Sequence, residues 1–584
     1  MNCPVTRRSA SWSIPHFRRS RTMLPEFTIQ TALRALWVLC VLTAANAVPV
    51  VAGEKPQIER LFPPGAQRGS TVTVSLTGKP GDGPLQIWSD RGQLTFSVAE
   101  KGDSVQVTVP GDASPGIHRL RFFNMHGASP LKAFVVGNLA EISEKEPNNK
   151  LADAQHPGTS QVVVNGVLQE GGDVDTYAVS LVKGQTLVAA MLAYRELDSP
   201  MDATLQLLNP RGTLVEQNDD DHGNDPQLVH EAREDGVYFV RTFAFPSAPN
   251  STIQFSGAPT YIYRLTLTTG PFADYSLPMT AEAAKPAEVH LVGWNLPASQ
   301  QQVSVTPQPG ESVTPLSGRD LGLPLAVDVV PYSSTAEGTD SAAADHAPPF
   351  SVSGVIRAPR EQDSFWFVGR KDQRLRIRAV ARARFSQLDP MVTVYSEDGK
   401  ELVTADDIDG ANMDASTDVT IPADGRYRIQ VKDRFDHGGL RFFYYITCEE
   451  PQPTFFATLA ENAFAMAPEM PLSIAVSIDR RDGFAGVIDF QVEGLPEGIV
   501  AETARSEKEG DSAKTVTLKL TGSPAAGFSG PLRIRAVSPD GPQRLVTAVI
   551  SGSTDTSDTH WLSAQPAVAA APAAAEGAAT PEKP

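Results

Sequence analysis

The sequence predicts an all-β protein built from several β-sandwich domains in tandem. Its 584 residues exceed what one hydrophobic core usually organises, so we expect several domains of roughly 100–200 residues each. Short runs of alternating apolar and polar residues recur along the chain, separated by turns rich in the 45 glycines and 47 prolines. Such alternation places successive side chains on opposite faces of a strand. Half-buried sheets are therefore expected along the chain.

The N-terminus has the pattern of a secretory signal. An apolar run at residues 35–45 follows five arginines, which are Arg7, Arg8, Arg18, Arg19 and Arg21. The run is short for a bilayer span, and small residues suited to cleavage follow it. We expect residues 1–53 to be a signal peptide, with Met1 or Met23 as the true start. The mature chain would then be secreted, or would lie in the periplasm or cell envelope.

Composition restricts the chemistry of the mature chain. The formal net charge of −18 disfavours a nucleic-acid partner, because phosphate binding needs clustered Lys and Arg, and makes a cation the more natural counterpart. Of the three cysteines, Cys3 and Cys40 lie in the signal segment, so Cys448 remains alone without a disulfide partner. No His or basic residue adjoins Cys448, which favours a small core residue over a reactive thiol.

An internal duplication relates residues 166–267 to residues 354–448. Three pairs recur 188 residues apart, and three more recur 187 residues apart: Gly166 and Gly354, Asp175 and Asp363, Gln185 and Gln373; Asp202 and Asp389, Gly212 and Gly399, Asp219 and Asp406. The segment "EDGVYFV" at 234–240 returns as "ADGRYRI" at 423–429. Small insertions fall between these anchors, where loops tolerate them. Two copies of one domain are therefore predicted.

The motifs of the first copy resemble a known family. They run "EKEPNN", "VNGVLQEGGDVDTYAVSLVKGQTL", "DATLQLLNPRG", an acidic loop and "EDGVYFV". In this order they resemble the bacterial pre-peptidase C-terminal (PPC) domain, a β-sandwich appended to many secreted proteases and related to the collagen-binding segments of bacterial collagenases. The resemblance is full over residues 139–270, named copy one, and partial over 350–450, named copy two.

The remaining segments are assigned from strand rhythm and turns alone. Residues 54–138 are similar to immunoglobulin-like domains of the IPT/TIG type. The expected order of the whole chain is 1–53 signal peptide, 54–138 immunoglobulin-like sandwich, 139–270 copy one, 271–332 short immunoglobulin-like segment, 333–349 linker, 350–450 copy two, 451–552 immunoglobulin-like sandwich and 553–584 disordered Ala/Pro-rich tail. The predicted fold class is thus a series of immunoglobulin-like and jelly-roll-like PPC sandwiches.

The segment "EKEPNN" at 144–149 gathers oxygen-bearing side chains where neither a helix nor a strand gains from them. Calcium prefers six to eight oxygen ligands, which carboxylates and Asn carbonyl groups supply. A second source lies at the start of a strand, in "GGDVDTY". The resemblance implies the same chemistry, because the matching segments of the collagen-binding relatives bind calcium. The implied ligands are Glu144, Glu146, Asn148, Asn149 and Asp175, with Asp173 as a substitute for an acid that the relatives carry where this chain has Gly172.

The alternative is a solvated acidic linker whose Glu and Asn side chains cap turns. Copy two serves as an internal comparison. An offset of 188 places Tyr332, Ser334, Ala336 and Glu337 opposite the ligand set. On that alignment we expect copy two to keep the sandwich without the calcium site.

Two acidic loops provide weaker metal candidates, at 218–225 and 406–410. Their alternate aspartates are Asp219, Asp221, Asp225, Asp407 and Asp409. Neither loop continues to the bidentate Glu of an EF-hand, and Asp, Asn and Gly are common in any turn, so plain turns are favoured. His222 and His230 could join Asp225 on a transition metal, but surface histidines are the favoured interpretation.

No familiar catalytic motif is present, and we do not expect an enzyme. The sequence lacks a His-Glu-x-x-His helix, a Gly-x-Ser-x-Gly elbow and a Walker loop. The leading hypothesis is a secreted, non-catalytic modular binding or scaffold protein whose partner is an extracellular or envelope protein or polysaccharide. Candidate contact aromatics are Tyr194, Tyr261 and Tyr263, although the repeat places Tyr263 in the core. The alternatives are a secreted hydrolase or accessory subunit of a secreted peptidase with an acidic-loop site, and a structural spacer of a surface layer.

Overall fold

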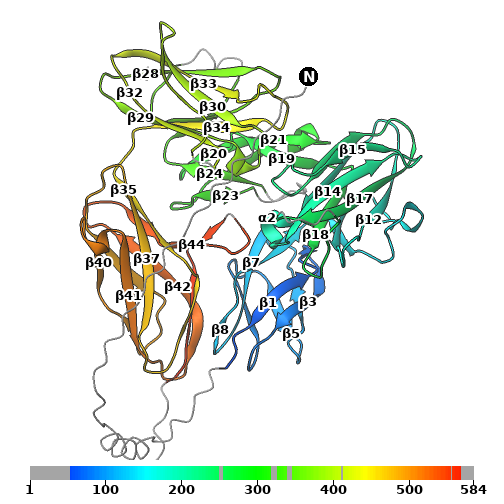
Figure 1. The fold of residues 1–584 in the computed structure, drawn as a ribbon, viewed down its shortest axis with the longest axis horizontal. Coiled ribbons are helices and arrows are strands. Elements are labelled where there is room, and N and C mark those ends of the chain that lie inside the picture. Colours follow the sequence, from blue (N-terminus) through cyan, green and yellow to red (C-terminus); the bar gives the residue numbers. More distant parts are fainter. Residues whose placement is uncertain are drawn as a thin grey trace, which may run out of the picture. The chain divides into compact units, whose positions relative to one another are not determined.

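The structure is a computed structural model that describes residues 53–248, 254–316, 325–338, 345–408, 412–553 and 555–566. The chain divides into two compact units, 1–52 and 53–584, and all described elements belong to the second. Almost all of these elements are strands, so the predicted multidomain all-β class is confirmed (Figure 1). The signal-peptide prediction lies outside the described residues, except for Gly53.

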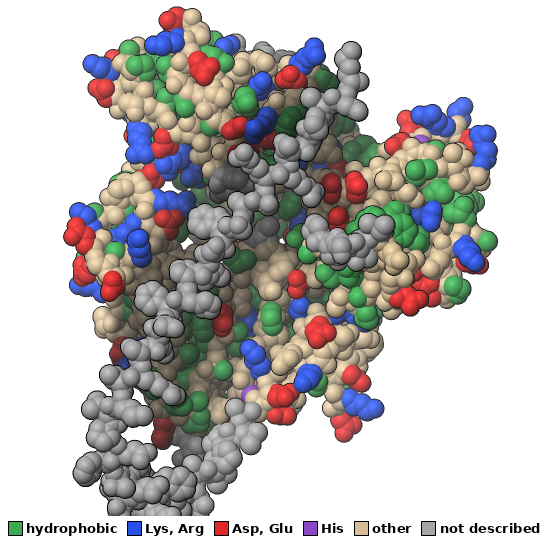
Figure 2. Space-filling model, in the orientation of Figure 1, with side chains coloured by type: hydrophobic (Ala, Val, Ile, Leu, Met, Phe, Trp, Pro, Cys, Tyr) green, Lys and Arg blue, Asp and Glu red, His purple; other side chains and the backbone are tan. Residues whose placement is uncertain are grey.

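Helical elements in the described ranges are single turns. They are η1 (Leu151–Asp153), α2 (Tyr194–Leu197), η2 (Ala298–Gln300), η4 (Arg382–Arg384) and η5 (Asp511–Ala513). None of the helices in the described part of the chain has the length and apolar character needed to cross a bilayer. On the face shown in Figure 2, acidic and basic side chains are interspersed.

The first domain is a sandwich of two sheets around one core. One sheet has the order β1 (Gln57–Phe62), β3 (Thr71–Lys79), β6 (Ser104–Thr108) and β5 (Thr95–Val98). The other has the order β2 (Gly65–Gln67), β9 (Lys132–Gly137), β7 (Gly116–Asn124) and β4 (Gln86–Ser89), with β8 (Gly127–Ala128) paired to β7. Val74, Val107 and Phe122 are among the side chains buried between them.

Copy one is a second sandwich. Its five-stranded sheet has the order β10 (Ala140–Ser143), β11 (Gln161–Val167), β18 (Ile262–Thr268), β13 (Thr186–Leu192) and β16 (Gln227–Glu231). Its four-stranded sheet has the order β12 (Asp175–Leu181), β17 (Gly236–Pro246), β14 (Met201–Leu208) and β15 (Leu214–Asn218). β10 runs parallel to β11 and pairs Ser143 with Asn165, which carries the "EKEPNN" segment onto the end of β11.

Copy two repeats this strand order. Its first sheet has the order β25 (Ser333–Ala336), β27 (Phe350–Val355), β34 (Phe443–Glu449), β29 (Arg374–Val380) and β32 (Ala415–Thr420). Its second has the order β26 (Asp345–His346), β28 (Gln362–Gly369), β33 (Gly425–Asp433), β30 (Pro390–Ser396) and β31 (Glu401–Ala405). β25 runs parallel to β27, as β10 does to β11. Cys448 is buried in this core as predicted.

The predicted linker at 333–349 is wrong in its described part. Residues 333–336 and 345–346 are strands that join both sheets of copy two. Their small and polar side chains have linker composition, but a parallel edge strand is held mainly by backbone hydrogen bonds and needs little apolar content. Copy two therefore begins near residue 333.

The two remaining immunoglobulin-like segments also form pairs of sheets. Residues 271–332 hold β19 (Phe272–Leu277), β21 (Ala287–Trp294) and β22 (Gln302–Val305) in one sheet, and β20 (Thr280–Glu282), β24 (Ala326–Val330) and β23 (Val313–Pro315) in the other. In the last domain, one sheet has the order β39 (Ile499–Ala501), β41 (Thr515–Gly522), β37 (Leu472–Arg481), β35 (Thr454–Leu459), β44 (Thr547–Val549) and β45 (Thr556–Ser557). The other sheet has the order β36 (Ala463–Met466), β46 (His560–Ala564), β42 (Phe528–Val537), β38 (Ile488–Glu493) and β40 (Ala504–Ser506), with β43 (Gln543–Leu545) paired to β42.

The predicted disordered tail from residue 553 is wrong at its start. β46 pairs with both β36 and β42 and completes the last sandwich. Trp561 is fully buried, with its ring centroid 4.6 Å from that of Phe123 and 5.8 Å from that of Trp88 in the first domain. The Ala/Pro-rich part of the prediction, from residue 567, lies outside the described residues.

Candidate metal centre

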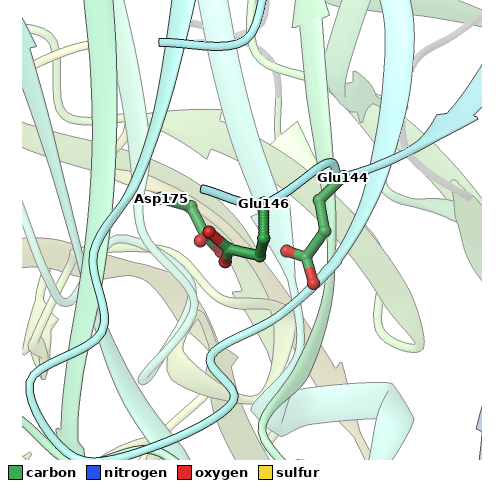
Figure 3. Close-up of side chains that lie close together, drawn as sticks. All are labelled: Glu144, Glu146 and Asp175. Carbon is green, nitrogen blue, oxygen red and sulfur yellow. The ribbon is translucent and has the colours of Figure 1, made fainter. Parts of the chain in front are cut away.

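Three of the predicted calcium ligands converge on one point. Glu144 follows β10, Glu146 lies two residues later, and Asp175 opens β12. Each offers a carboxylate oxygen, and these oxygens lie within 4.8 Å of one another. In Figure 3 the carboxyl groups of Glu146 and Asp175 face each other, with that of Glu144 beside them. We call Glu144, Glu146 and Asp175 the acidic centre.

The backbone holds Glu144 in place. Its N–H donates to the carbonyl of Asn165 at 2.9 Å, and its Oε2 accepts from the N–H of Val167 at 2.9 Å. This approach requires glycine at position 166, since a Cβ there would lie 2.7 Å from Glu144 Oε2 and 2.2 Å from the hydroxyl oxygen of Tyr263. The repeat's first glycine anchor thus makes room for the acidic centre.

Asp175 is the buried member of the acidic centre. It is 0% exposed, and its Oδ2 accepts a hydrogen bond from the hydroxyl of Tyr263. The Tyr263 hydroxyl lies 2.5 Å from that of Tyr177, deeper in the core. The other oxygen, Oδ1, is buried without a hydrogen-bond partner among the described residues. A buried carboxylate oxygen without a donor is costly, so it is a suitable ligand for a cation.

Burial and mutual repulsion of the carboxylates in the acidic centre favour either their protonation or the binding of a cation. Burial raises the pKa of Glu144 to about 7, against the hydrogen bond from Val167, and the charge of Glu146 adds to the rise. Burial and then the charge of Glu144 raise the pKa of Asp175 well above its usual range. Burial and the charge of Asp173 raise the pKa of Glu146. Crowded carboxylates resist ionisation together unless positive charge joins them.

The other three predicted ligands take different positions. Asn148 is buried, and neither its Oδ1 nor its Nδ2 has a hydrogen-bond partner among the described residues. Asp173 accepts from the N–H groups of Gln169 at 2.6 Å and Val174 at 2.9 Å, so it closes the turn before β12. Asn149 is exposed. The donor set of the acidic centre fits a hard cation, because it offers carboxylate oxygens with a buried amide oxygen nearby in sequence.

Copy two contains a related centre that the alignment of the sequence missed. The expectation that the ligands of the "EKEPNN" segment have no counterpart in copy two is wrong for Glu144, whereas Asp363 was already the predicted counterpart of Asp175. Glu337 follows β25 as Glu144 follows β10, and its Oε1 accepts from the N–H of Val355 at 3.2 Å. Asp363 accepts from the hydroxyl of Tyr444 at 2.6 Å. Five extra residues precede β27, so the offset here is 193 and the constant offset of 188 misplaced the segment.

The weaker metal candidates have protein partners instead. Asp225 is fully buried and accepts from the N–H groups of Ala193, Tyr194 and Arg195 at 3.2, 2.7 and 3.2 Å. Asp407 pairs with Arg434 at 3.2 Å. Asp219 is exposed, and Asp409 lies outside the described residues. These contacts agree with the interpretation of the loops as structural turns. Asp225 caps the helical turn α2.

The remaining candidate, Asp221, belongs to a buried junction that sequence reasoning missed. Arg441 of copy two lies 2.5 Å from Asp274 and 3.4 Å from Asp221, and His222 lies 3.4 Å from Asp274. We call Asp221, His222, Asp274 and Arg441 the buried junction. All four residues are at most 9% exposed. A signal existed in the sequence, since the charged Asp274 stands between Ala273 and Tyr275 in a predominantly apolar stretch.

The prediction of surface histidines is therefore wrong. His222 is 6% exposed and His230 is 7% exposed. Burial, and then the charge of Arg441, lower the pKa of His222 to about 4, so it is neutral near pH 7. Burial by itself would raise the pKa of Asp274, but the charge of Arg441 and the hydrogen bonds with His222 and Arg441 together outweigh it and lower that pKa to about 2.

The candidate contact aromatics are divided by the structure. Tyr263 is fully buried, as the repeat predicted, and Tyr261 is 9% exposed within the same core. Tyr194 is 45% exposed at the start of α2. Of the three, Tyr194 alone presents much of its ring to solvent.

Comparison with known proteins gives matches among solved structures and identifies no family for this chain. No family model matches the chain, and no curated protein matches it. Among solved structures the chain is similar to fibronectin(III)-like modules of Clostridium thermocellum CbhA, with 13% identity over 31% of this chain and 87% of that one and a TM-score of 0.12. It is also similar to the Bacteroides ovatus mixed-linkage glucan utilization locus protein SGBP-B, solved with a mixed-linkage heptasaccharide, with 11% identity over 68% of this chain and 74% of that one and a TM-score of 0.13. A third match is surface layer protein SbsC, domains 1–6, with 10% identity over 85% of this chain and 54% of that one and a TM-score of 0.13.

Proposed function

We propose that this chain is an exported, non-catalytic binding or scaffold protein whose first PPC-like module is stabilised by calcium. The observation that carries the calcium proposal is the acidic centre, where three carboxylates share a space within 4.8 Å and one is fully buried. Glu144, Glu146 and Asp175 would hold the ion, and Asn148 is the nearest amide candidate. Bound calcium would supply the positive charge that these carboxylates need.

Calcium at this position would act on the architecture of the chain. The acidic centre joins the segment that leaves β10 to the first residue of β12, which belong to opposite sheets of copy one. Tying them together would fix the segment that enters copy one from the first domain. The ion would therefore rigidify a module boundary.

The non-catalytic part of the proposal is supported by the surroundings of the acid–histidine contact. His222 and Asp274 have the residue types of an acid–base pair and are among the residues that line a cavity, but their side chains are only 7% and 1% exposed, and Asp274 is paired with Arg441. A substrate must reach such a pair before it can act on it. The partner we propose is an extracellular or envelope polymer or protein, bound by the module surfaces.

Calcium binding is tested on the mature chain by titration calorimetry and by thermal unfolding in calcium or in chelator. When free calcium is about 100 times Kd, the folded state gains about 3 kcal/mol, and a transition should rise by several degrees. Glu146→Ala should abolish both effects, because it removes one of the three carboxylates of the acidic centre. Since Glu146 is exposed, the substitution leaves the core intact. Glu231→Ala, an exposed substitution on β16 of the same module, should change neither. Identical melts of the unmodified chain in both conditions would refute the calcium site.

The binding role is tested by capturing partners from the native envelope with the mature chain, followed by a broad hydrolase screen. We expect retention of a polymer or protein and no turnover. Turnover that disappears when one acidic-loop residue is replaced would establish the hydrolase alternative instead.

A further inference from the structure

The two copies build the same frame around one glutamate. In copy one the N–H of Val167 donates to Glu144, and in copy two the N–H of Val355 donates to Glu337. A Cβ on Gly354 would lie 2.7 Å from Glu337 Oε2, the same distance as between Gly166 and Glu144 Oε2. Each frame also contains a tyrosine hydroxyl that donates to an aspartate at the start of the next strand. The two centres are therefore equivalent positions.

The frames differ two residues beyond the shared N–H donor. Copy one has Gln169 there, and its Nε2 lies 3.5 Å from Glu144 Oε1. Copy two has Arg357, whose guanidinium forms an ion pair with Glu337 Oε1 and donates to the carbonyl of Val355 at 3.3 Å. The same side-chain position thus carries a neutral amide in one copy and a permanent positive charge in the other.

One matched acidic position differs in the same direction. Copy one brings Glu146 to its centre in addition to Glu144 and Asp175. In copy two the second residue after Glu337 is Thr339 in the sequence, so that position supplies no carboxylate. One guanidinium can balance much of the charge of Glu337 and Asp363, whereas three carboxylates call for a divalent ion.

We propose that Arg357 replaces the metal ion in copy two, and that the residue at this position decides whether a PPC-like copy binds calcium. Gln169 leaves the position neutral and lets the acidic centre take a cation, whereas Arg357 fills the equivalent centre from within the chain. The proposal rests on the proposed calcium site of copy one. It divides the two modules into one whose stability follows calcium concentration and one whose stability is independent of calcium.

The positions of Gln169 and Arg357 can be substituted without repacking a hydrophobic core. The side chain of Arg357 is 53% exposed, and Gln169 is exposed as well. Both lie in the loop between two strands, after the paired residues of β11 and β27. A substitution here changes charge at the mouth of the centre while the sandwich packing stays as it is.

The first test is Arg357→Gln in the mature chain, read by hydrogen exchange of the backbone around residues 333–338 and 355. In chelator we expect this segment to exchange at least tenfold faster than in the unmodified chain, and 10 mM calcium should restore most of the protection. Arg357→Lys keeps a cation and should remain protected in chelator. Unchanged exchange in Arg357→Gln, or faster exchange that calcium fails to restore, would overturn the proposal.

The second test is Gln169→Arg, read by calcium titration and by exchange around residues 144–149. We expect at least a tenfold loss of calcium affinity, while the segment in chelator becomes as protected as in the calcium-loaded unmodified chain. Undiminished calcium affinity would overturn the inference. The proposed function itself fails if the unmodified chain does not bind calcium, which is a separate result. In that case, hydrogen exchange of Arg357→Gln around residues 333–338 and 355 still tests the inference about copy two.

Discussion

Copy one and copy two have the same strand order, apart from the edge strand β26 that copy two adds to its second sheet, yet they carry different charges at the same place. Copy one gathers three carboxylates around the end of β11, and copy two sets a guanidinium against its glutamate. Since both sandwiches close around intact cores, the acidic cluster is not a requirement of the fold. The difference teaches that this sandwich tolerates either an acidic cluster or an ion pair at the same position.

A second difference concerns the loop after β15 and the loop after β31. In both copies a buried aspartate, Asp225 or Asp414, accepts three backbone N–H groups at a short helical turn. Copy one alone, among the described residues, uses this loop to reach the other copy, since Asp221 contacts Arg441. A shared structural acid and a specialised acid thus lie in the same loop.

The largest effect is expected from Arg441→Ala, which would break the buried junction. It leaves Asp274 and Asp221 buried without their counter-ion, so the free energy of unfolding should fall by about 3–5 kcal/mol. Denaturant unfolding measures it. Arg434→Ala, which removes a half-exposed ion pair in copy two, should cost under about 1 kcal/mol. Equal losses for both variants would show that the junction contributes no more than a surface pair.

The shared cap should matter equally in both copies. Asp225→Ala and Asp414→Ala each leave three N–H groups without an acceptor, and we expect each to lower the unfolding free energy by about 2–3 kcal/mol. Asp→Asn at either position retains one side-chain oxygen and should cost less. A loss confined to copy one would mean that the caps are not equivalent.

A pH effect should distinguish the loop of copy one. The pKa of His222 is about 4 in the folded chain, below the usual 6.5, so the unfolded chain binds the proton more tightly. Stability is therefore fully present above pH 6.5 and is lost as pH falls toward 4, by about 2 kcal/mol between pH 7 and 5. Unfolding of the unmodified chain and of His222→Gln at both pH values measures it. The difference between the two proteins should change with pH; a constant difference would contradict a neutral buried His222.

The smallest effect is expected at Tyr177, which Phe365 replaces in copy two. The hydroxyl of Tyr177 contacts that of Tyr263, which in turn donates to Asp175. Tyr177→Phe makes copy one resemble copy two and should cost about 1 kcal/mol, because the aspartate keeps its own donor. Thermal unfolding in chelator tests this. A loss as large as that from Tyr263→Phe would show that the two hydroxyls act as one unit.

Much of the architecture was predictable because strand alternation and internal repetition are local signals. The duplication placed Gly166 with Gly354 and Asp175 with Asp363, and the structure gives these residues equivalent surroundings. Two short strands escaped prediction: β25 is an edge strand of linker-like composition, and β46 is an internal, fully buried strand of five residues close to the Ala/Pro-rich tail. Their identity depends on the strand beside them, and a single sequence does not display that partner.

The candidate site was partly predictable for the same reason. Glu144, Glu146 and Asp175 were identified from residue chemistry and family resemblance, and they converge. Asn149 is exposed and does not join them. Which side chains of this irregular segment are buried depends on the path that its backbone takes over the sandwich. Glu337 was misaligned, because an insertion before β27 shifts the register by five residues.

Sequence patterns were enough to predict a series of β-sandwiches with one duplicated module and an acid-rich entrance to its first copy. Period-two patterning and turn residues are enough for that, because they act between neighbours along the chain. Folding decides which acids are structural caps, which form the junction with Arg441 and which gather in the acidic centre. Those roles depend on distance and burial, since the energy of a charge is set by the groups that folding brings around it.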